Sequence, residues 1–412
     1  MRPPKLKQLL FFIPLIVLVV FLLGFSIVSS HHWTQQFSFL AQSFLHGKLY
    51  FLHSIGGISH DPVVYHHRIY WSEGPFPAIM LLPFVAIGYG FHFFFYQGYI
   101  SWLLSLGTLY FIYKIGRKYS YSPRDSLLLA LTFALGSVYI AASTITGVYT
   151  FAQVVTVFLL FWVMYEYLVR EKTRWWLIGI ISAFIVLTRA SAAPIIVFFL
   201  LELVTLVRKD PKKTKNFLAL LLPVALAVAL VGIYNFLRFH NFFQSGYKYQ
   251  LAFPRSAASK NLGVLNPIHI PANLYSLVLR PPLTVLRSAN SWTLKFPFIK
   301  NNMLGMSMFI TSPYLLYLFS QKWKSYSGQL KRLLIASGLS ILVVLSVFAI
   351  GGMQYGYRYS LDFLPELFVV FMVLYRKHNS KLSFGMQSLL IASIVINCYL
   401  FLPALFTGSF GY

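Results

Sequence analysis

The sequence predicts an all-α, polytopic integral membrane protein with about 10 to 12 transmembrane helices. Of the 412 residues, 58% are hydrophobic and 10% are charged, whereas about a quarter of the residues in a soluble domain are charged. Apolar runs of about 20 residues recur, which is the length a helix needs to cross a bilayer. Clusters of Lys and Arg separate these runs. The composition excludes a cytosolic enzyme, a disordered protein and a disulfide scaffold, and Cys398 is the single cysteine.

The chain has 34 Lys and Arg against 9 Asp and Glu, a net charge of +25. Such a balance would indicate a nucleic-acid partner in a soluble protein. Multi-pass proteins, however, concentrate Lys and Arg in their cytoplasmic loops. We therefore expect membrane lipids, and no nucleic acid, as partners.

The first apolar run, from about residue 9 to 28, follows Arg2, Lys5 and Lys7. It is too long for the core of a signal peptide, and no small-residue cleavage site follows it. We expect a first membrane helix with a cytoplasmic N-terminus. Basic clusters then occur at 114–124, 170–174, 208–215, 322–332 and 376–381.

If all these clusters are cytoplasmic, the crossings follow from the apolar runs between them. They are expected near 126–142, 146–169, 175–190, 192–207, 216–237, 303–320, 333–350, 360–375 and 384–406. Three segments then lie outside: about 30–75, about 238–300 and 351–359. Residues 76–115 are apolar throughout, and they could form two crossings or one crossing with a re-entrant or interfacial segment.

We divide the chain into residues 1–237, an N-terminal transmembrane catalytic module that includes the first outer loop; 238–300, the second outer loop; and 301–412, the C-terminal transmembrane helices. No Gly-rich phosphate loop follows a strand. A reaction driven by a nucleotide in the cytoplasm is therefore not expected.

Most of the nine acidic residues lie in or beside the basic clusters, where local ion pairs account for them. Four are expected on the outer side: Asp61, Glu73, Asp362 and Glu366. A carboxylate base on that side has to come from these four. Asp61 could equally open an Asp-Pro turn. Asp362 could pair with Arg358 four residues earlier on a helix.

Seven of the 11 histidines fall between His31 and His67. Their spacing matches no metal signature, and interfacial hydrogen bonds or phosphate contacts explain them equally well. We assign no metal site.

Arg189 and Arg358 are expected at the outer ends of two helices. A guanidinium matches the geometry of a phosphate and stays charged, although an arginine there could also simply reach to the interface. The second outer segment has no acidic residue. It contains eight cations: Arg238, Lys248, Arg255, Lys260, Arg280, Arg287, Lys295 and Lys300. An anionic ligand or anionic lipid headgroups would explain this excess.

Four local patterns carry a resemblance to a family. They are FLAQSFLHGKLY at 39–50; the run from Tyr70-Trp71 through GPFPA to Pro83; YNFLRF at 234–239 followed by Gly-Tyr at 246–247; and GYRY at 356–359 before Leu-Pro at 364–365. With these patterns, the chain resembles the polytopic GT-C glycosyltransferases, especially bacterial proteins of the protein-mannosyltransferase-like group. Many of those proteins carry an Asp directly after the first helix, where this chain has Ser29-Ser30-His31-His32-Trp33.

The resemblance implies an enzyme of the bacterial plasma membrane that moves a sugar, with inversion, from a polyprenyl-phosphate donor to an extracytoplasmic glycan, lipid or protein. Asp61 would be the general base, with Glu73 as the alternative. Arg189, Arg358 and Arg238 would bind the lipid phosphate.

The substrate would contact His60, Tyr65, His66, Tyr70, Trp71 and Tyr357. No cofactor beyond the donor is implied, and a divalent metal stays an open alternative. Two other functions remain: a transporter or flippase of a lipid-linked glycan, and a non-catalytic assembly factor that binds a glycolipid.

Overall fold

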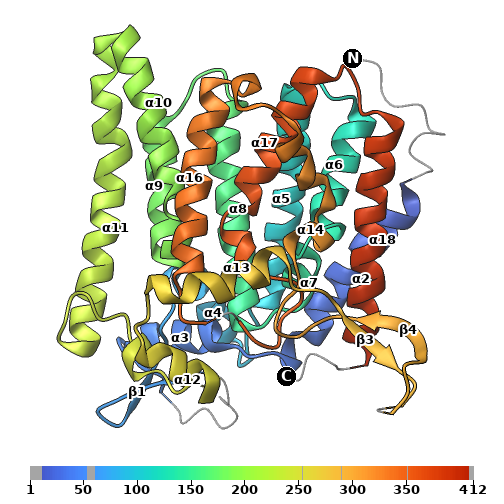
Figure 1. Cartoon of the computed structure of the whole chain (residues 1–412). Coiled ribbons are helices and arrows are strands. Elements are labelled where there is room, and N and C mark those ends of the chain that lie inside the picture. The colour runs from blue at the N-terminus through green and yellow to red at the C-terminus, as the bar shows by residue number, and fades with distance from the viewer. Residues whose placement is uncertain (1–11, 53–60, 253, 289, 350, 408–412) are drawn as a thin grey trace.

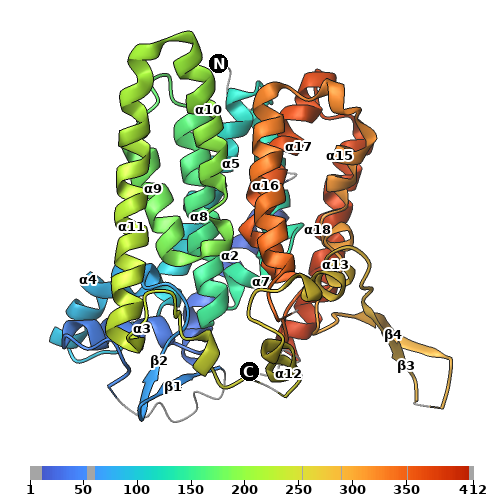
Figure 2. The same ribbon diagram turned by 60° about the vertical axis from the view of Figure 1, so that its left-hand side comes forward.

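A computed structural model describes residues 12–52, 61–252, 254–288, 290–349 and 351–407. Long helices run side by side between two ends of the molecule (Figures 1 and 2). Within the described part of the chain, six helical segments are long and apolar enough to cross a membrane: Ile13–His32, Val148–Leu168, Ala190–Lys209, Pro211–Phe239, Gly328–Leu345 and Phe384–Phe406. This confirms the prediction of a helical, membrane-embedded protein.

The N-terminal half contains most of the helical core. Its helices are α2 (Ile13–Val28), α3 (Gln36–Leu45), α4 (Phe76–Gly90), α5 (Gly98–Lys118), α6 (Pro123–Leu135), α7 (Tyr139–Thr144), α8 (Val148–Leu168), α9 (Trp175–Thr188), α10 (Ile195–Lys209) and α11 (Lys215–Phe239). Helix α8 is the central one, because 83% of its apolar window is buried. Only 17% of the corresponding window is buried in the segment that contains α11, so α11 presents most of its apolar surface to the surroundings.

The C-terminal half begins with a long irregular segment. Its helices are α12 (Pro254–Asn261), α13 (Ile270–Val278), α14 (Met308–Thr311), α15 (Tyr317–Ser320), α16 (Gly328–Leu345), α17 (Leu364–His378) and α18 (Phe384–Phe406). A 3₁₀ helix, η8 (Arg358–Asp362), precedes α17. Two antiparallel hairpins complete the fold: β1 (Val63–Tyr65) with β2 (Arg68–Tyr70), and β3 (Leu283–Leu286) with β4 (Leu294–Lys300).

The basic clusters predicted to share one side do meet at one end, the upper end in Figure 1, which we call the basic end. There Arg376 donates hydrogen bonds to the carbonyl oxygen of Ser120, and the Lys377 ammonium donates to that of Ser325 at 2.7 Å. Arg332 forms an ion pair with Glu202 at 2.7 Å. The orientation of this end toward the cytoplasm stays a prediction.

The structure decides between the two topologies left open for residues 76–115. Helix α4 begins and ends at the opposite end, which we call the site end. The backbone N–H of Gln97, which directly precedes α5, donates to Gln35 at 2.9 Å, and its side chain donates to the carbonyl oxygen of Thr146 at 2.7 Å. Helix α5 then runs from the site end to the basic end (Figure 1). The arrangement observed is therefore one helix that runs from end to end, preceded by a segment that stays at the site end.

Two predicted crossings are not single helices. The segment expected near 303–320 consists of α14, a 3₁₀ turn at Pro313–Leu316 and α15, because Pro313 removes a backbone donor and clashes with the preceding turn. The segment expected near 126–142 is divided at Gly136 into α6 and α7.

Candidate functional site

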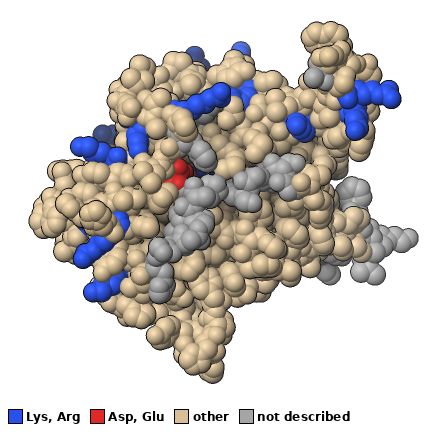
Figure 3. Space-filling view, turned by 90° about the horizontal axis from the view of Figure 1, so that it is seen from below, with Lys and Arg blue, Asp and Glu red and all other residues tan. Residues whose placement is uncertain are grey.

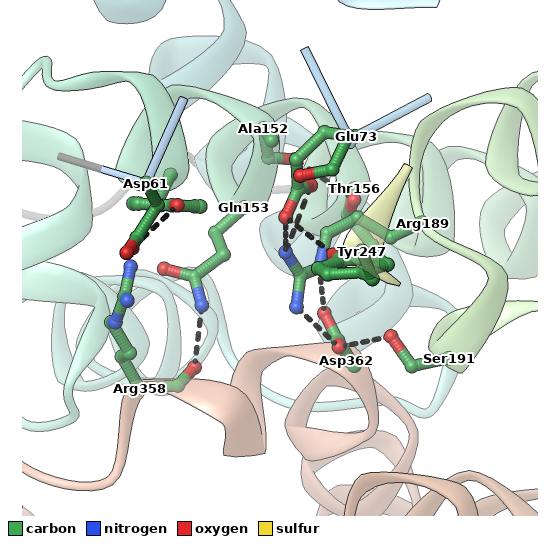
Figure 4. Close-up of polar contacts among 12 residues, drawn as sticks. Asp61, Glu73, Ala152, Gln153, Thr156, Arg189, Ser191, Tyr247, Arg358 and Asp362 are labelled. Carbon is green, nitrogen blue, oxygen red and sulfur yellow. Dashed lines mark hydrogen bonds and ion pairs between the residues drawn. The ribbon is translucent and has the colours of Figure 1, made fainter. Parts of the chain in front are cut away.

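Several acidic and basic side chains that are distant in sequence converge at the site end. They come from the segment before β1, the loop after β2, the end of α9 and η8. Figure 4 shows two groups separated by Gln153: Arg189 with Glu73 and Asp362 on one side, and Asp61 with Arg358 on the other. Of the four acids predicted on one side, Asp61, Glu73 and Asp362 lie here, whereas Glu366 is buried in α17 and accepts a hydrogen bond from Ser337 in the middle of α16.

Arg189 is the centre of the first group. Its Nε lies 2.7 Å from Oδ1 of Asp362, and its Nη2 lies 2.9 Å from Oδ2. Its Nη1 lies 3.3 Å from Oε2 of Glu73. The Arg189 side chain is 8% exposed, and those of Glu73 and Asp362 are 7% and 0% exposed. Each nitrogen of this buried guanidinium thus faces a carboxylate.

Hydroxyl groups complete the coordination of both carboxylates. The Ser191 hydroxyl donates to Oδ2 of Asp362 at 2.5 Å, and the Tyr247 hydroxyl donates to Oε1 of Glu73 at 3.4 Å. Burial and the nearby Glu73 raise the pKa of Tyr247 well above its ordinary value, so this hydroxyl keeps its proton and can donate. Charged groups without water need such partners.

A close backbone approach brings Glu73 to Arg189. A Cβ atom on Gly74 would lie 2.1 Å from the carbonyl oxygen of Leu187, so only glycine lets the loop after β2 contact the end of α9. Helix α9 ends at Thr188, and Arg189 follows in an extended conformation with φ −145°. The side chain of Arg189 is thereby turned from the helix toward η8.

Burial raises the pKa of Glu73 above its ordinary value, and the positive charge of Arg189 opposes that shift. Asp362 raises the pKa further, whereas Arg358 lowers it. Glu73 therefore belongs to a closed ion-pair network. It is less accessible to an acceptor than the half-buried Asp61.

Asp61 and Arg358 form the second group, and Tyr149 connects them. The Tyr149 hydroxyl donates to Oδ2 of Asp61 at 2.9 Å. The guanidinium carbon of Arg358 lies 4.9 Å from the centre of the Tyr149 ring, a cation–π distance. Figure 4 shows the Arg358 side chain pointing toward Asp61. The Asp61 carboxylate and the Arg358 guanidinium thus contact the same tyrosine, and both residues are half-buried.

A small pocket adjoins Arg358. Its wall is apolar along α7, with Val138, Ala141, Ala142 and Ile145, and polar opposite, with Gln153 and Arg358 among its residues. Within the described structure, neither Nε of Arg358 nor Oε1 of the fully buried Gln153 has a hydrogen-bond partner. An apolar wall beside available polar groups fits a ligand with a hydrocarbon part and an anionic part.

The third predicted phosphate ligand, Arg238, is 3% exposed. It donates to the carbonyl oxygen of Trp71 at 2.6 Å and to Oδ1 of Asn235 at 2.8 Å. Its guanidinium carbon lies 3.7 Å from the centre of the Tyr234 ring. Arg238 therefore holds the loop after β2 against α11, and it does not line the pocket.

The predicted substrate-binding residues are distributed over several places. Tyr65 and Tyr70 belong to an aromatic cluster with Phe239. Trp71 is fully buried, and its ring lies 5.4 Å from that of Tyr149. Tyr357 is also fully buried, and its hydroxyl donates to Asn273 at 2.9 Å. His66 is exposed at the β1–β2 turn, and His60 lies outside the described residues.

Sequence reasoning missed Tyr149, Gln153 and Tyr247 as members of the site. Tyr149 and Gln153 lie in the first two turns of the apolar helix α8, where nothing in the sequence distinguishes them from core residues. The predicted helical pair of Arg358 with Asp362 is replaced by the pair of Asp362 with Arg189.

Viewed from the site end, the face of the molecule carries scattered Lys and Arg (Figure 3). In this view, Asp and Glu atoms among the described residues come to the surface in a hollow beside the residues drawn in grey. Across the same described residues, no group of three His, Cys, Asp or Glu side chains is close enough to hold a metal ion.

Comparisons with protein-family models, with curated proteins and with solved structures find no match for this chain. The likeness to the GT-C glycosyltransferases therefore stays a resemblance in local sequence, and the function has to be argued from the site.

Proposed function

We propose that this protein is a membrane glycosyltransferase that uses a polyprenyl-phosphate sugar as donor and acts at the site end, on an extracytoplasmic acceptor. One observation carries the proposal: Asp61 and Arg358 both contact Tyr149, next to a pocket with an apolar wall. A carboxylate that can accept a proton beside a cation that can hold a phosphate is what this transfer needs.

In the proposed reaction, the acceptor hydroxyl oxygen attacks C1 of the sugar while the bond from C1 to the phosphate oxygen breaks. The attack from the opposite side inverts the configuration at C1. Asp61 takes the hydroxyl proton, and Arg358 stabilises the negative charge that develops on the departing phosphate. The first carbons of the lipid chain lie along Ala141, Ala142 and Ile145.

The proposal divides the three arginines between two tasks. Arg358 has an available Nε, whereas the nitrogens of Arg189 face carboxylates and those of Arg238 face Trp71 and Asn235. We therefore assign the binding of the donor phosphate to Arg358. Arg189 is a positioning residue, because its pair with Asp362 fixes η8, the element that carries Arg358.

The test is transfer in proteoliposomes with radiolabelled polyprenyl-phosphate sugars and a cell-envelope acceptor fraction. Asp61→Asn should lower transfer by about 10²- to 10⁴-fold, the usual contribution of a general base. Glu171→Gln is the matched control, because Glu171 is an exposed carboxylate on a loop between α8 and α9. Arg358→Met should raise the KM for the donor.

Full transfer by Asp61→Asn would remove Asp61 from the mechanism and make Glu73 the next residue to replace. Donors that bind to the wild-type protein and stay intact would instead favour the flippase or the assembly factor. Neither of those functions requires a base beside the pocket.

A further inference from the structure

The β3–β4 hairpin is exposed on both of its faces. Of the residues in its two strands, only Val285 and Pro297 are partly shielded. Figures 1 and 2 both show it projecting sideways from the site end, away from the helices. An isolated two-stranded hairpin is marginally stable at best in water. A hairpin of this kind therefore needs a further surface to lie against.

The side chains of the hairpin indicate what that surface is. Trp292 is 96% exposed, Phe296 is 72% exposed and Phe298 is 50% exposed. The exposed cations Arg287, Lys295 and Lys300 belong to the same hairpin. No Asp or Glu occurs anywhere from residue 211 to residue 361. Tryptophan is enriched at the boundary between lipid and water, and cations there attract anionic headgroups.

The attachment point places the hairpin at the depth of that boundary. The hydroxyl of Tyr399, in α18, donates to the carbonyl oxygen of Pro297 in β4. The apolar helix α18 continues for seven more residues to Phe406, which is about 10 Å at 1.5 Å per residue. The middle of β4 thus lies beside the apolar part of a membrane span, and Arg287 and Lys295 lie beyond this contact, toward the turn of the hairpin.

We infer that the β3–β4 hairpin is an interfacial anchor, which lies in the headgroup region of the surrounding bilayer and binds anionic lipid headgroups through Arg287, Lys295 and Lys300. The aromatic side chains enter the boundary with the acyl chains, and the cations pair with lipid phosphates. This role is independent of the transfer reaction. It also accounts for a basic segment at the end opposite to the basic end.

The first experiment measures depth. In a Cys398→Ser background, a nitroxide label is placed at Trp292→Cys or, for comparison, at Lys213→Cys, an exposed residue in the turn between α10 and α11. The protein is reconstituted in nanodiscs of phosphatidylcholine, alone or mixed with phosphatidylglycerol. The label at 292 should be more accessible to oxygen than to a water-soluble nickel chelate, and the label at 213 should show the reverse.

The second experiment tests the charge requirement. Phosphatidylglycerol should move the label at 292 deeper than phosphatidylcholine alone. Replacing Arg287, Lys295 and Lys300 together by Gln should abolish that shift, whereas the matched replacement of Lys212, Lys213 and Lys215 should preserve it. A label at 292 that is open to the nickel chelate in every bilayer would overturn the anchor and indicate a protein partner. If the depth of the label at 292 is the same with and without phosphatidylglycerol, the proposed binding of anionic headgroups is wrong.

Discussion

Arg189 and Asp362 are 173 residues apart in sequence, yet their side chains form a bidentate ion pair with contacts of 2.7 and 2.9 Å. This pair joins the end of α9 to η8, and Glu73 extends it to the loop after β2. Three segments of the chain are thus connected by one buried guanidinium. Since Arg358 begins η8, the network also determines where the proposed phosphate ligand lies.

Removing one partner of this pair should strongly destabilise the fold. Asp362→Asn leaves the Arg189 charge buried with only Glu73 to balance it, and breaking a buried pair in this way costs about 3–5 kcal/mol. The measurement is the free energy of unfolding in mixed detergent micelles. Glu171→Gln, which removes an exposed carboxylate, should change that free energy by less than about 0.5 kcal/mol. Equal stability of the two variants would contradict the structural role of the pair.

Tyr149→Phe should lower the proposed activity without weakening donor binding. The change removes the hydrogen bond to Asp61 but keeps the ring on which Arg358 lies. A hydrogen bond to a charged group contributes about 1.5–3 kcal/mol, so kcat should fall about ten- to hundredfold. The KM for the donor should stay unchanged. Tyr89→Phe, at an exposed position on α4, is the control, and an equal loss in both variants would count against an orienting role for Tyr149.

Gly74→Ala should separate Glu73 from Arg189. The added methyl group would meet the carbonyl oxygens of Leu187 and Thr188 at 2.1 and 2.8 Å, which forces the loop to move. Such overpacking typically costs about 1–3 kcal/mol. Gly90→Ala, at the other end of α4, meets nothing within 4 Å and is the matched control. An unfolding free energy that is equally unchanged in both variants would show that the loop adjusts without cost.

The sequence predicts the long apolar helices well, because their length and composition are set by the bilayer. The sequence does not decide how many spans residues 76–115 form, since 40 apolar residues can form two spans or one. The contacts of Gln97 with Gln35 and Thr146 decide it. These contacts join segments that lie 62 and 49 residues apart, and no local pattern encodes them.

In the site, too, the sequence does not show which side chains contact each other. Arg358 and Asp362 have the spacing of a helical ion pair, but they lie in a 3₁₀ helix. With three residues per turn, positions i and i+4 are about 120° apart, so Asp362 is turned away from Arg358 and toward Arg189. The sequence identifies the charged residues of the site but not which of them pair.

The stability of the protein should depend on pH through Glu73. Its pKa is raised by burial above the ordinary value of 4.5, so the folded protein holds this proton more tightly than the unfolded chain does. Such a group stabilises the fold fully below its unfolded pKa, and that contribution is lost as the pH rises through the folded pKa. The free energy of unfolding of the wild type minus that of Glu73→Gln should therefore decrease as the pH is raised from about 4 to 8. A wild-type advantage that grows with pH would mean that the attraction of Arg189 outweighs the burial of Glu73.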